Sequence, residues 1–202
     1  WTQKKGTAQP QQDGHLRELT LRTIEDAIHL KERLASRPSV IVIGGGALGM
    51  EVASGCVHVG CEVTLVADVK PLARQLGDHL ADIFTSAAIR RGLRVVGGGK
   101  ARLVDHGAGV KVVLANGTEL EADLVVTAVG DEPNTGWLAG SNLLVDGQLR
   151  VDSRGRLRPD IVAAGDVASF PTRRGVERVP LWTSAIDQAK IAGVGLFRGD
   201  AA

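Results

Sequence analysis

One stretch of the chain, Val40–Gly49, restricts the possible folds more than any other. It reads VIVIGGGALG, four β-branched residues in succession that are stopped by three glycines. An uninterrupted β-branched run is typical of a strand buried on both faces of a parallel sheet. After the glycines, apolar residues recur at intervals of three or four, which is the spacing of one face of a helix. These residues are Leu48, Val52, Cys56 and Val59. The stretch therefore predicts a strand, a glycine turn and a helix in direct succession.

The segment that follows completes a β-α-β unit. Gly60 stands where a helix commonly ends, and Cys61–Val66 (CEVTLV) has the apolar character of a second strand. A crossover of this kind joins parallel strands and is right-handed. Further helices are predicted at residues 26–34 and 80–91, with a strand at 93–96. The predicted fold class is α/β, with a Rossmann-type arrangement at its centre.

Short strands are predicted next, at residues 101–104, 110–115 and 119–129. Asn116-Gly117, between the last two, is the strongest short signal for a β-hairpin. The three strands are expected to form an antiparallel meander inserted in the α/β domain. Beyond the turn-rich residues 136–158, the sequence predicts a strand at 161–164 and a C-terminal helix. The apolar stripe of that helix is Trp182, Ala185, Ile186, Ala189, Gly193 and Leu196.

The composition argues against several classes of partner. Lys and Arg number 24 and Asp and Glu 23, so the charge gives no reason to expect a nucleic acid or a membrane surface as partner. The most apolar stretch is interrupted by glycines and is too short to span a bilayer. Two cysteines in 202 residues favour a reducing compartment, so a cytoplasmic protein is expected. The five histidines have no metal-ligand spacing, and no metal site is predicted.

The glycine turn has the pattern Gly44-x-Gly46-x-x-Gly49 between a strand and a helix, which is the setting of a dinucleotide-binding turn. The first glycine allows the tight bend, the second lets the backbone approach a pyrophosphate, and the third permits close packing of helix and strand. N–H groups at the helix start then face the phosphates. The alternative is a glycine-rich turn that binds nothing. The predicted cofactor-binding residues of the turn are Gly44, Gly45, Gly46, Ala47, Leu48 and Gly49.

Asp68 is the candidate for recognition of the cofactor's ribose. It follows the second strand, 19 residues after Gly49, where a carboxylate accepts from the ribose 2′-hydroxyl of NAD(H). Lys70 and Arg74 follow closely and would instead suit the 2′-phosphate of NADPH. The sequence favours NADH but leaves both cofactors open, and a solvated loop aspartate is the structural alternative.

Five blocks of the sequence occur in a recognisable order. They are LRTIEDA (21–27), VIVIGGGALGMEVA (40–53), NGTELEADLVVTAVGDEPNT (116–135), RPDIVAAGDVASF (158–170) and RVPLWTSAIDQA (178–189). With these blocks the chain resembles the pyridine nucleotide-disulfide oxidoreductase superfamily, whose members are FAD-dependent NAD(P)H enzymes. It is most similar to the ferredoxin/rubredoxin reductase branch. The resemblance implies that hydride passes from the nicotinamide to the flavin and that electrons then leave singly to ferredoxin or a similar iron–sulfur protein.

The resemblance also implies roles for single residues. Glu51 matches a glutamate near the nicotinamide ring, where its carboxylate orients the carboxamide. Gly130 and Pro133 match a Gly-x-x-Pro turn beside the nucleotide. Gly165-Asp166 matches the motif whose aspartate accepts a hydrogen bond from the ribityl chain of FAD, and Trp182 matches an aromatic residue close to flavin and nicotinamide.

Departures from the family pattern limit what the chain is expected to do. The family's FAD half opens with its own Gly-x-Gly-x-x-Gly turn, which is missing here, and Ala67 stands where a glutamate is usual. Residues 1–35 are expected to be a lead-in and connecting helix, 36–143 the NAD(P)-binding domain, and 144–202 the trailing, incomplete part of a FAD-binding domain. Whether the chain is itself an enzyme is left open, because FAD binding is in doubt. The alternative function is a non-catalytic nucleotide-binding or assembly module.

Two further expectations concern association and the cysteines. Residues 144–202 would bury apolar side chains against the FAD half, so a homo-oligomer is expected to form through this segment. Cys56 and Cys61 resemble a Cys-x4-Cys redox pair, but they lie on the nucleotide-domain helix and just beyond its end. We expect two buried free thiols that act as small apolar residues.

Overall fold

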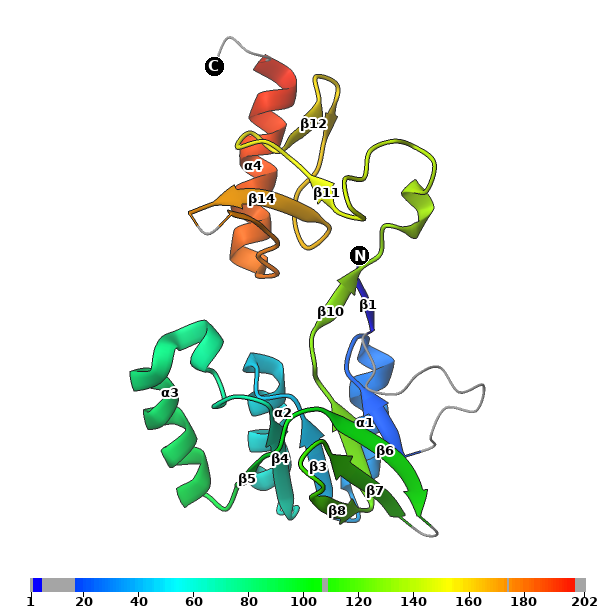
Figure 1. Cartoon of the computed structure of the whole chain (residues 1–202), viewed down its shortest axis with the longest axis vertical. Helices are drawn as coiled ribbons and strands as arrows, with labels where there is room; N and C mark the ends of the chain where they lie inside the picture. Colours follow the sequence, from blue (N-terminus) through cyan, green and yellow to red (C-terminus); the bar gives the residue numbers. More distant parts are fainter. Residues whose placement is uncertain (1, 5–16, 107–108, 174, 199–202) are drawn as a thin grey trace. The chain divides into compact units, whose positions relative to one another are not determined.

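The computed structural model describes residues 2–4, 17–106, 109–173 and 175–198. Two compact units are present: the sheet unit, residues 4–130, and the C-terminal unit, residues 1–3 and 131–202 (Figure 1). The functional boundaries expected at residues 36 and 143 stay a prediction. Among the described residues, no helix combines the length and the apolar character needed to cross a membrane.

A five-stranded parallel sheet forms the centre of the sheet unit. In spatial order its strands are β2 (Glu18–Thr20), β9 (Leu124–Thr127), β3 (Val40–Ile43), β4 (Val63–Ala67) and β5 (Arg94–Gly97). All neighbours pair in parallel. Helix α2 (Ala47–His58) connects β3 to β4, which confirms the predicted β-α-β unit. The edge strand β2, only three residues long, has no sequence pattern of its own and was not predicted.

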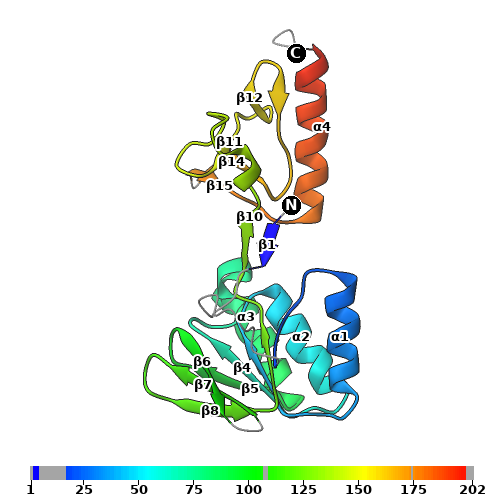
Figure 2. The same ribbon diagram turned by 90° about the vertical axis from the view of Figure 1, so that its right-hand side faces the viewer.

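Each face of this sheet is covered by a different layer. Val40 and Val42 of β3 pack with residues of α2 in one core, while Ile41 and Ile43 pack with the antiparallel strands in a second core. Alternation of side chains along a strand produces this division. Figure 2 shows α1, α2 and α3 on one side of the sheet and the antiparallel strands on the other. Burial on both faces explains why β3 consists of four β-branched residues.

The antiparallel layer is the predicted meander, with one correction. Its strands are β6 (Ala101–His106), β7 (Gly109–Leu114) and β8 (Glu119–Ala122). Asn116-Gly117 forms the hairpin turn, with Gly117 at φ +86°. The single strand predicted at 119–129 was wrong, because the chain divides at Asp123 into β8 and β9. In β8 (ELEA), exposed and buried side chains alternate, so only one face of this strand is packed. Every residue of β9 (LVVT) is buried, because this strand is covered on both faces in the central sheet.

Helix α2 buries a different face from the one predicted. Val52 and Cys56 are buried as expected, but Leu48 and Val59 are 44% and 45% exposed. Gly49 and Ala53 complete the buried face, because a residue three or four positions away lies on the same side. The small side chains on this face let α2 lie close to the sheet.

The two cysteines close the end of α2. Gly60 takes a left-handed φ of +90°, its N–H donates to Val57 O at 3.0 Å, and the Cys61 N–H donates to Cys56 O at 3.0 Å. These two bonds define a Schellman motif, in which the residues at the Cys56 and Cys61 positions form an apolar contact. Both thiols are free and buried, as predicted. Their spacing of five residues is therefore that of a helix end.

The outer helices extend further than their periodicity indicated. Helix α1 (Ile24–Leu34) begins with a capping box between Thr23 and Asp26. Helix α3 spans Ala73–Arg90 instead of 80–91, with a kink at Gly77, which has φ +75°. Leu72, Leu76 and Leu80 recur at intervals of four, but Gly77 interrupts this stretch, and the sequence prediction did not extend the helix across it.

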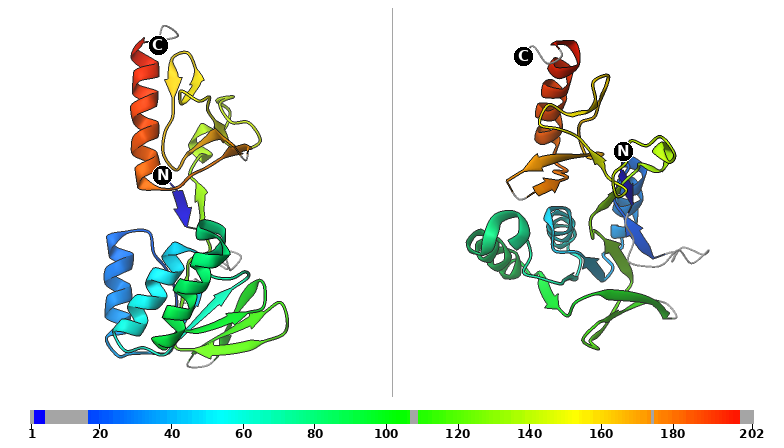
Figure 3. Two further views of the ribbon diagram at one scale, coloured as in Figure 1. Left: turned by 90° about the vertical axis from the view of Figure 1, so that its left-hand side faces the viewer. Right: turned by 45° about the horizontal axis from the view of Figure 1, so that its top comes forward.

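The C-terminal unit is built around helix α4 (Trp182–Arg198), which packs against two paired strands (Figure 3). These are β12 (Arg156–Arg158) and β13 (Ile161–Val162), the latter shorter than the strand predicted at 161–164. A separate sheet contains β11 (Leu149–Arg150), β14 (Ala168–Thr172) and β15 (Gly175–Glu177). Strand β10 (Asp131–Pro133) pairs with β1 (Thr2–Lys4). Gln188 and Ala192 form the buried face of α4, whereas Trp182 and Ile186 of the predicted stripe are 83% and 40% exposed.

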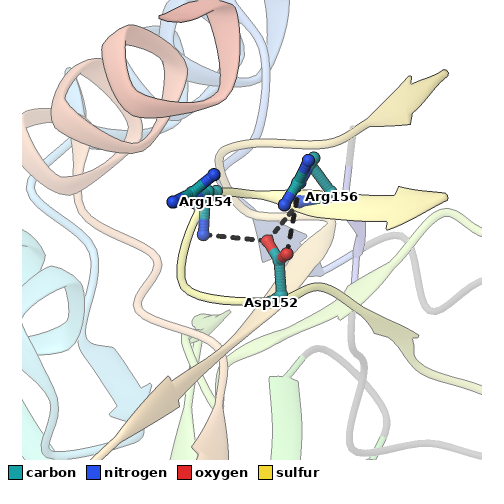
Figure 4. Close-up of polar contacts among 3 residues, drawn as sticks. All are labelled: Asp152, Arg154 and Arg156. Carbon is teal, nitrogen blue, oxygen red and sulfur yellow. Dashed lines mark hydrogen bonds and ion pairs between the residues drawn. The ribbon is translucent and has the colours of Figure 1, made fainter. Parts of the chain in front are cut away.

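A carboxylate-centred turn fixes the strand that faces α4. Asp152 Oδ1 accepts from the backbone N–H groups of Arg154 and Arg156, at 2.8 and 2.9 Å (Figure 4). Burial alone would raise the pKa of Asp152, but these hydrogen bonds and the Arg156 guanidinium lower it overall. The turn holds Gly155 against α4, where a Cβ would lie 2.8 Å from the Ala192 Cβ.

We predict that the two thiols of the folded chain react slowly with iodoacetamide, and Cys56 more slowly than Cys61. Burial, followed by the nearby Cys61 group, raises the pKa of Cys56 to about 11, and burial also raises the pKa of Cys61. The folded state therefore holds the Cys56 proton more tightly than the unfolded chain does. This stabilisation is complete below about pH 9 and is lost as the pH rises toward about 11. Equal, rapid alkylation of both thiols in the folded protein would contradict the prediction; urea-unfolded chain is the control.

Candidate functional site

The predicted dinucleotide turn lies at the carboxyl end of three neighbouring strands. The Gly44 N–H donates to Val66 O of β4 at 2.8 Å, and the Ala128 N–H, just after β9, donates to Ile43 O at 2.8 Å. The turn is thus fixed between the ends of β4 and β9. Ligands of open parallel sheets bind at this edge, beyond the carboxyl ends of the strands.

Three of the four glycines in the turn are required by the fold itself. A Cβ on Gly44, which has φ +118°, would lie 2.2 Å from Ala128 O. One on Gly49 would lie 1.8 Å from Gly44 O, and one on Gly45 would lie 2.8 Å from the Ala67 Cβ. Contacts this short do not occur for real side chains, so these positions accept no residue larger than glycine without rearrangement.

Gly46 differs from its neighbours because the space beside it is open. The nearest atom to a Cβ built there is Gln75 Nε2, at 3.5 Å, and its φ of −76° suits any residue. Gly46 is also the N-cap of α2 and accepts the first bond of the helix ladder, from the Met50 N–H at 3.0 Å. The N–H groups of Ala47, Leu48 and Gly49 precede that bond, so the helix offers them no carbonyl four residues back. Free N–H groups beside an open glycine fit the pyrophosphate of a dinucleotide.

Glu51 lies one turn into the same helix and is exposed. It therefore projects from the polar side of α2, away from the core cysteines. Its predicted role toward the nicotinamide stays a prediction.

Asp68 lies directly after β4, as predicted, but it already has a partner. Its Oδ2 pairs with Arg74 Nη2 at 2.8 Å, and its Oδ1 accepts from the Val69 N–H at 2.9 Å. Lys70, the other candidate for a 2′-phosphate, pairs with Asp82 at 2.8 Å and with Asp78 at 3.6 Å. The hydrogen bond with Asp82 is the largest cause that raises the pKa of Lys70. Both candidate cations are thus matched by carboxylates.

Pro71 and Leu72, just before α3, pack against the glycine turn, a contact that the sequence did not predict. The Leu72 N–H donates to Gly45 O at 2.8 Å, and Pro71 Cα would lie 3.2 Å from a Cβ on Gly45. Gln75, in the first turn of α3 itself, is the polar side chain next to Gly46. Only the proximity of this segment to Asp68 in the sequence could have indicated it.

The remaining predicted residues belong to the C-terminal unit, apart from Gly130, which ends the sheet unit with φ +105°. Pro133 ends β10. Gly165 has φ +79°, and its N–H donates to the Oε1 of buried Gln188 at 2.7 Å. Asp166 follows and is partly exposed, while Trp182 begins α4. Gln188 therefore fixes the Gly165-Asp166 turn to α4, a contact that the sequence pattern did not predict.

Metal binding finds no support in the described part of the chain. No group of three or more His, Cys, Asp or Glu side chains there is arranged to hold a metal ion.

Comparison with known proteins agrees with this geometry. Residues 7–189 match the profile of the family described as pyridine nucleotide-disulphide oxidoreductase. The chain belongs to that family. The match covers both units and includes the turn at Gly44–Gly49 as well as Gly165-Asp166.

Several of the individual proteins that the chain resembles are named as reductases. The chain is 31% identical to the ferredoxin–NAD(+) reductase component of the p-cumate 2,3-dioxygenase system of Pseudomonas putida, over 84% of this chain and 42% of that protein. It is 34% identical to rhodocoxin reductase of Rhodococcus erythropolis, over 84% of this chain and 41% of that protein. A crystal structure of a ferredoxin reductase from Rhodopseudomonas palustris superposes with a TM-score of 0.80 and 32% identity, over 91% of this chain and 47% of that one. The chain therefore spans less than half the length of these relatives.

We predict that Gly46→Ala weakens NADH binding at least ~10-fold while leaving the free energy of unfolding within about 1 kcal/mol of the original. The new methyl group has room in the protein but occupies the space beside the free N–H groups. NADH fluorescence titration and thermal unfolding measure the two effects.

Two other glycines of α2 provide the controls. Gly55→Ala meets nothing within 4 Å, so it should stabilise the helix by about 0.5–1 kcal/mol without changing NADH affinity. Gly49→Ala should disrupt folding. If the Gly46→Ala variant binds NADH as tightly as the original chain, the cofactor does not bind at this turn.

Proposed function

We propose that this chain binds NADH at the Gly44–Gly49 turn as the nicotinamide-binding part of a ferredoxin reductase-type flavoprotein. The observation that carries the proposal is the open face of Gly46, beside three N–H groups that the helix leaves free, in a turn otherwise closed by close contacts. A Rossmann-type NAD(P)-binding assignment for the sheet unit follows from the same turn.

The chemistry of such a protein resides in its cofactors, and the chain binds and orients them. Bound NADH would supply a hydride, and a bound flavin would allow that electron pair to be delivered singly to an iron–sulfur protein. The turn would hold the pyrophosphate, Glu51 would orient the carboxamide, and Asp166 and Trp182 would contribute to the flavin side. The sequence contains one Gly-x-Gly-x-x-Gly turn, so we assign the flavin pyrophosphate to no residue of this chain.

The ion pairs around Asp68 favour NADH over NADPH. Arg74 and Lys70, which would attract a 2′-phosphate, are neutralised by Asp68, Asp78 and Asp82. Asp68 keeps lone pairs that can accept from a ribose hydroxyl, because a carboxylate accepts several hydrogen bonds. A 2′-phosphate would instead meet the negative charge of Asp68.

We predict that the chain binds NADH more tightly than NADPH and that Asp68→Ala reverses this preference. The substitution removes the acceptor for the ribose hydroxyl and releases the Arg74 guanidinium for a phosphate. Titration of each nucleotide against both proteins measures the ratio of the dissociation constants.

Arg74→Ala is the matched control, because it breaks the same ion pair but keeps the carboxylate. An exposed pair of this kind contributes little to stability, so both variants should fold and Arg74→Ala should still prefer NADH. A wild-type preference for NADPH would contradict the assignment. Absence of binding to either nucleotide would leave the assembly-module function.

The partner surfaces are also proposals. A ferredoxin or a similar iron–sulfur protein is the electron acceptor that the relatives' names suggest. For association with a second copy, we propose the apolar surface of α4 formed by Trp182, Ile186 and Phe197, which are 83%, 40% and 90% exposed. Their spacing places them on one face of the helix.

We predict a concentration-dependent dimer of the 202-residue chain by light scattering. Charges introduced by Trp182→Glu and Ile186→Glu together should shift the mass to that of a monomer, because buried charges oppose apolar contact. Val176→Glu, at a residue of β15 that is 45% exposed, is the matched control and should leave the dimer intact. A monomer at high concentration of the unaltered chain would contradict the proposal.

A further inference from the structure

The side chain of Gln75 lies beside the open face of the dinucleotide turn. Among the described segments other than the turn itself, its Nε2 is the nearest atom to a Cβ built on Gly46, at 3.5 Å. The N–H groups of Ala47, Leu48 and Gly49, which the helix leaves free, follow directly after Gly46. A side-chain donor and three backbone donors therefore lie at the same turn.

Gln75 is the donor of its segment that has no carboxylate partner. Three side chains between residues 70 and 75 can donate hydrogen bonds, those of Lys70, Arg74 and Gln75. The two cations pair with carboxylates, as described above. The Gln75 side chain is exposed, and its carboxamide has no hydrogen-bond partner among the described residues. It therefore stays available to a ligand at the turn.

The backbone that carries Gln75 is anchored to the glycine turn through Leu72. The Leu72 N–H donates to Gly45 O at 2.8 Å, and the Leu72 side chain packs against the core that contains α2. Leu72 O accepts from the N–H groups of Gln75 and Leu76, at 3.1 and 2.9 Å. One residue thus joins the glycine turn to the first turn of α3, which fixes the position of the Gln75 backbone relative to Gly46.

The anchor itself has an unfavourable backbone conformation. Leu72 has φ +63°, in the left-handed region, where a glycine would be free of strain and a leucine is not. At the other end, Gly77 has φ +75°, so residues 73–76 form a short turn that is set off from the rest of α3. Strained residues of this kind are concentrated at ligand sites. The strain at Leu72 is consistent with a segment that is shaped to place Gln75 at the turn.

We propose that Gln75 is a cofactor-binding residue whose side-chain amide donates a hydrogen bond to the pyrophosphate of NADH. The proposal rests on the function proposed above, the binding of NADH at the Gly44–Gly49 turn. An exposed side chain changes rotamer freely, so the Nε2 donor can reach an oxygen that occupies the space beside Gly46. A neutral amide adds a directional donor without adding charge. Gln75 would therefore orient the pyrophosphate.

This role differs from that of Asp68, because the pyrophosphate is common to NADH, NADPH and ADP-ribose. A change at Gln75 should alter the affinity for all three ligands by the same factor. The preference between NADH and NADPH should stay as it is in the unaltered chain. A contact with the nicotinamide would instead spare ADP-ribose, which lacks that ring.

Two substitutions of opposite charge test the contact by calorimetric titration of NADH and ADP-ribose. Gln75→Glu has nearly the same shape but replaces the donor with a negative charge, so both dissociation constants should rise at least ~10-fold. Gln75→Lys keeps a donor and adds a positive charge, so it should bind both ligands at least as tightly as the original chain. Any gain in affinity should fall as salt is added. A purely structural role at an exposed residue would not give opposite effects.

Ser86→Glu is the matched control, because it places the same negative charge on an exposed residue further along α3. It should leave both dissociation constants unchanged. Thermal unfolding should be similar for all three variants, since each alters an exposed side chain.

¹⁵N NMR of the 202-residue chain provides a direct measurement. On addition of ADP-ribose, the side-chain NH2 signal of Gln75 should shift with the same dissociation constant as the backbone amides of residues 47–49. Its assignment follows from its absence in Gln75→Glu.

The outcomes separate this proposal from the proposed function. The role of Gln75 is overturned, while NADH binding at the turn stands, if the amides of residues 47–49 respond but the Gln75 signal does not. The same holds if Gln75→Glu binds as tightly as the original chain, or if Ser86→Glu weakens binding equally. Absence of any nucleotide binding by the unaltered chain overturns both proposals.

Discussion

The contact between Gly49 and Gly44 is the constraint on which the rest of the sheet unit depends. A Cβ on Gly49 would lie 1.8 Å from Gly44 O, so the first turn of α2 rests directly on the end of β3. This approach fixes where α2 starts and aims its free N–H groups beyond the strand ends. It also sets the line along which Val52, Ala53 and Cys56 meet the sheet. The geometry of the turn and the packing of the core are therefore one arrangement.

The local parts of this arrangement could be predicted from the sequence because their signals are local. The β-branched run, the glycine spacing and Asn116-Gly117 each act within a few residues. The division at Asp123 could not, because it depends on hydrogen bonds to Ser39, 84 residues away in the chain. The three-residue strand β2 is likewise stabilised by its pairing with β9, not by its own composition.

The candidate site shows the same limit. The glycines and Asp68 were identified by pattern, and the structure places them at one sheet edge. The pairing of Asp68 with Arg74 and the position of Gln75 beside Gly46 depend on how residues 68–75 fold back over the turn. The role of Gln188 depends on side-chain placement across 23 residues. Periodicity contains no information about such contacts.

The strand order has a consequence for how the chain folds. Strand β9 lies between β2 and β3, although 80 residues lie between the end of β3 at Ile43 and the start of β9 at Leu124. During synthesis, β2 and β3 therefore emerge long before the strand that joins them. Until residue 127 leaves the ribosome, each presents an unpaired edge to the solvent and to other nascent chains. The sheet is therefore completed by a long-range pairing that forms late. We expect chaperones to act mainly before this step, while the strand edges are still unpaired.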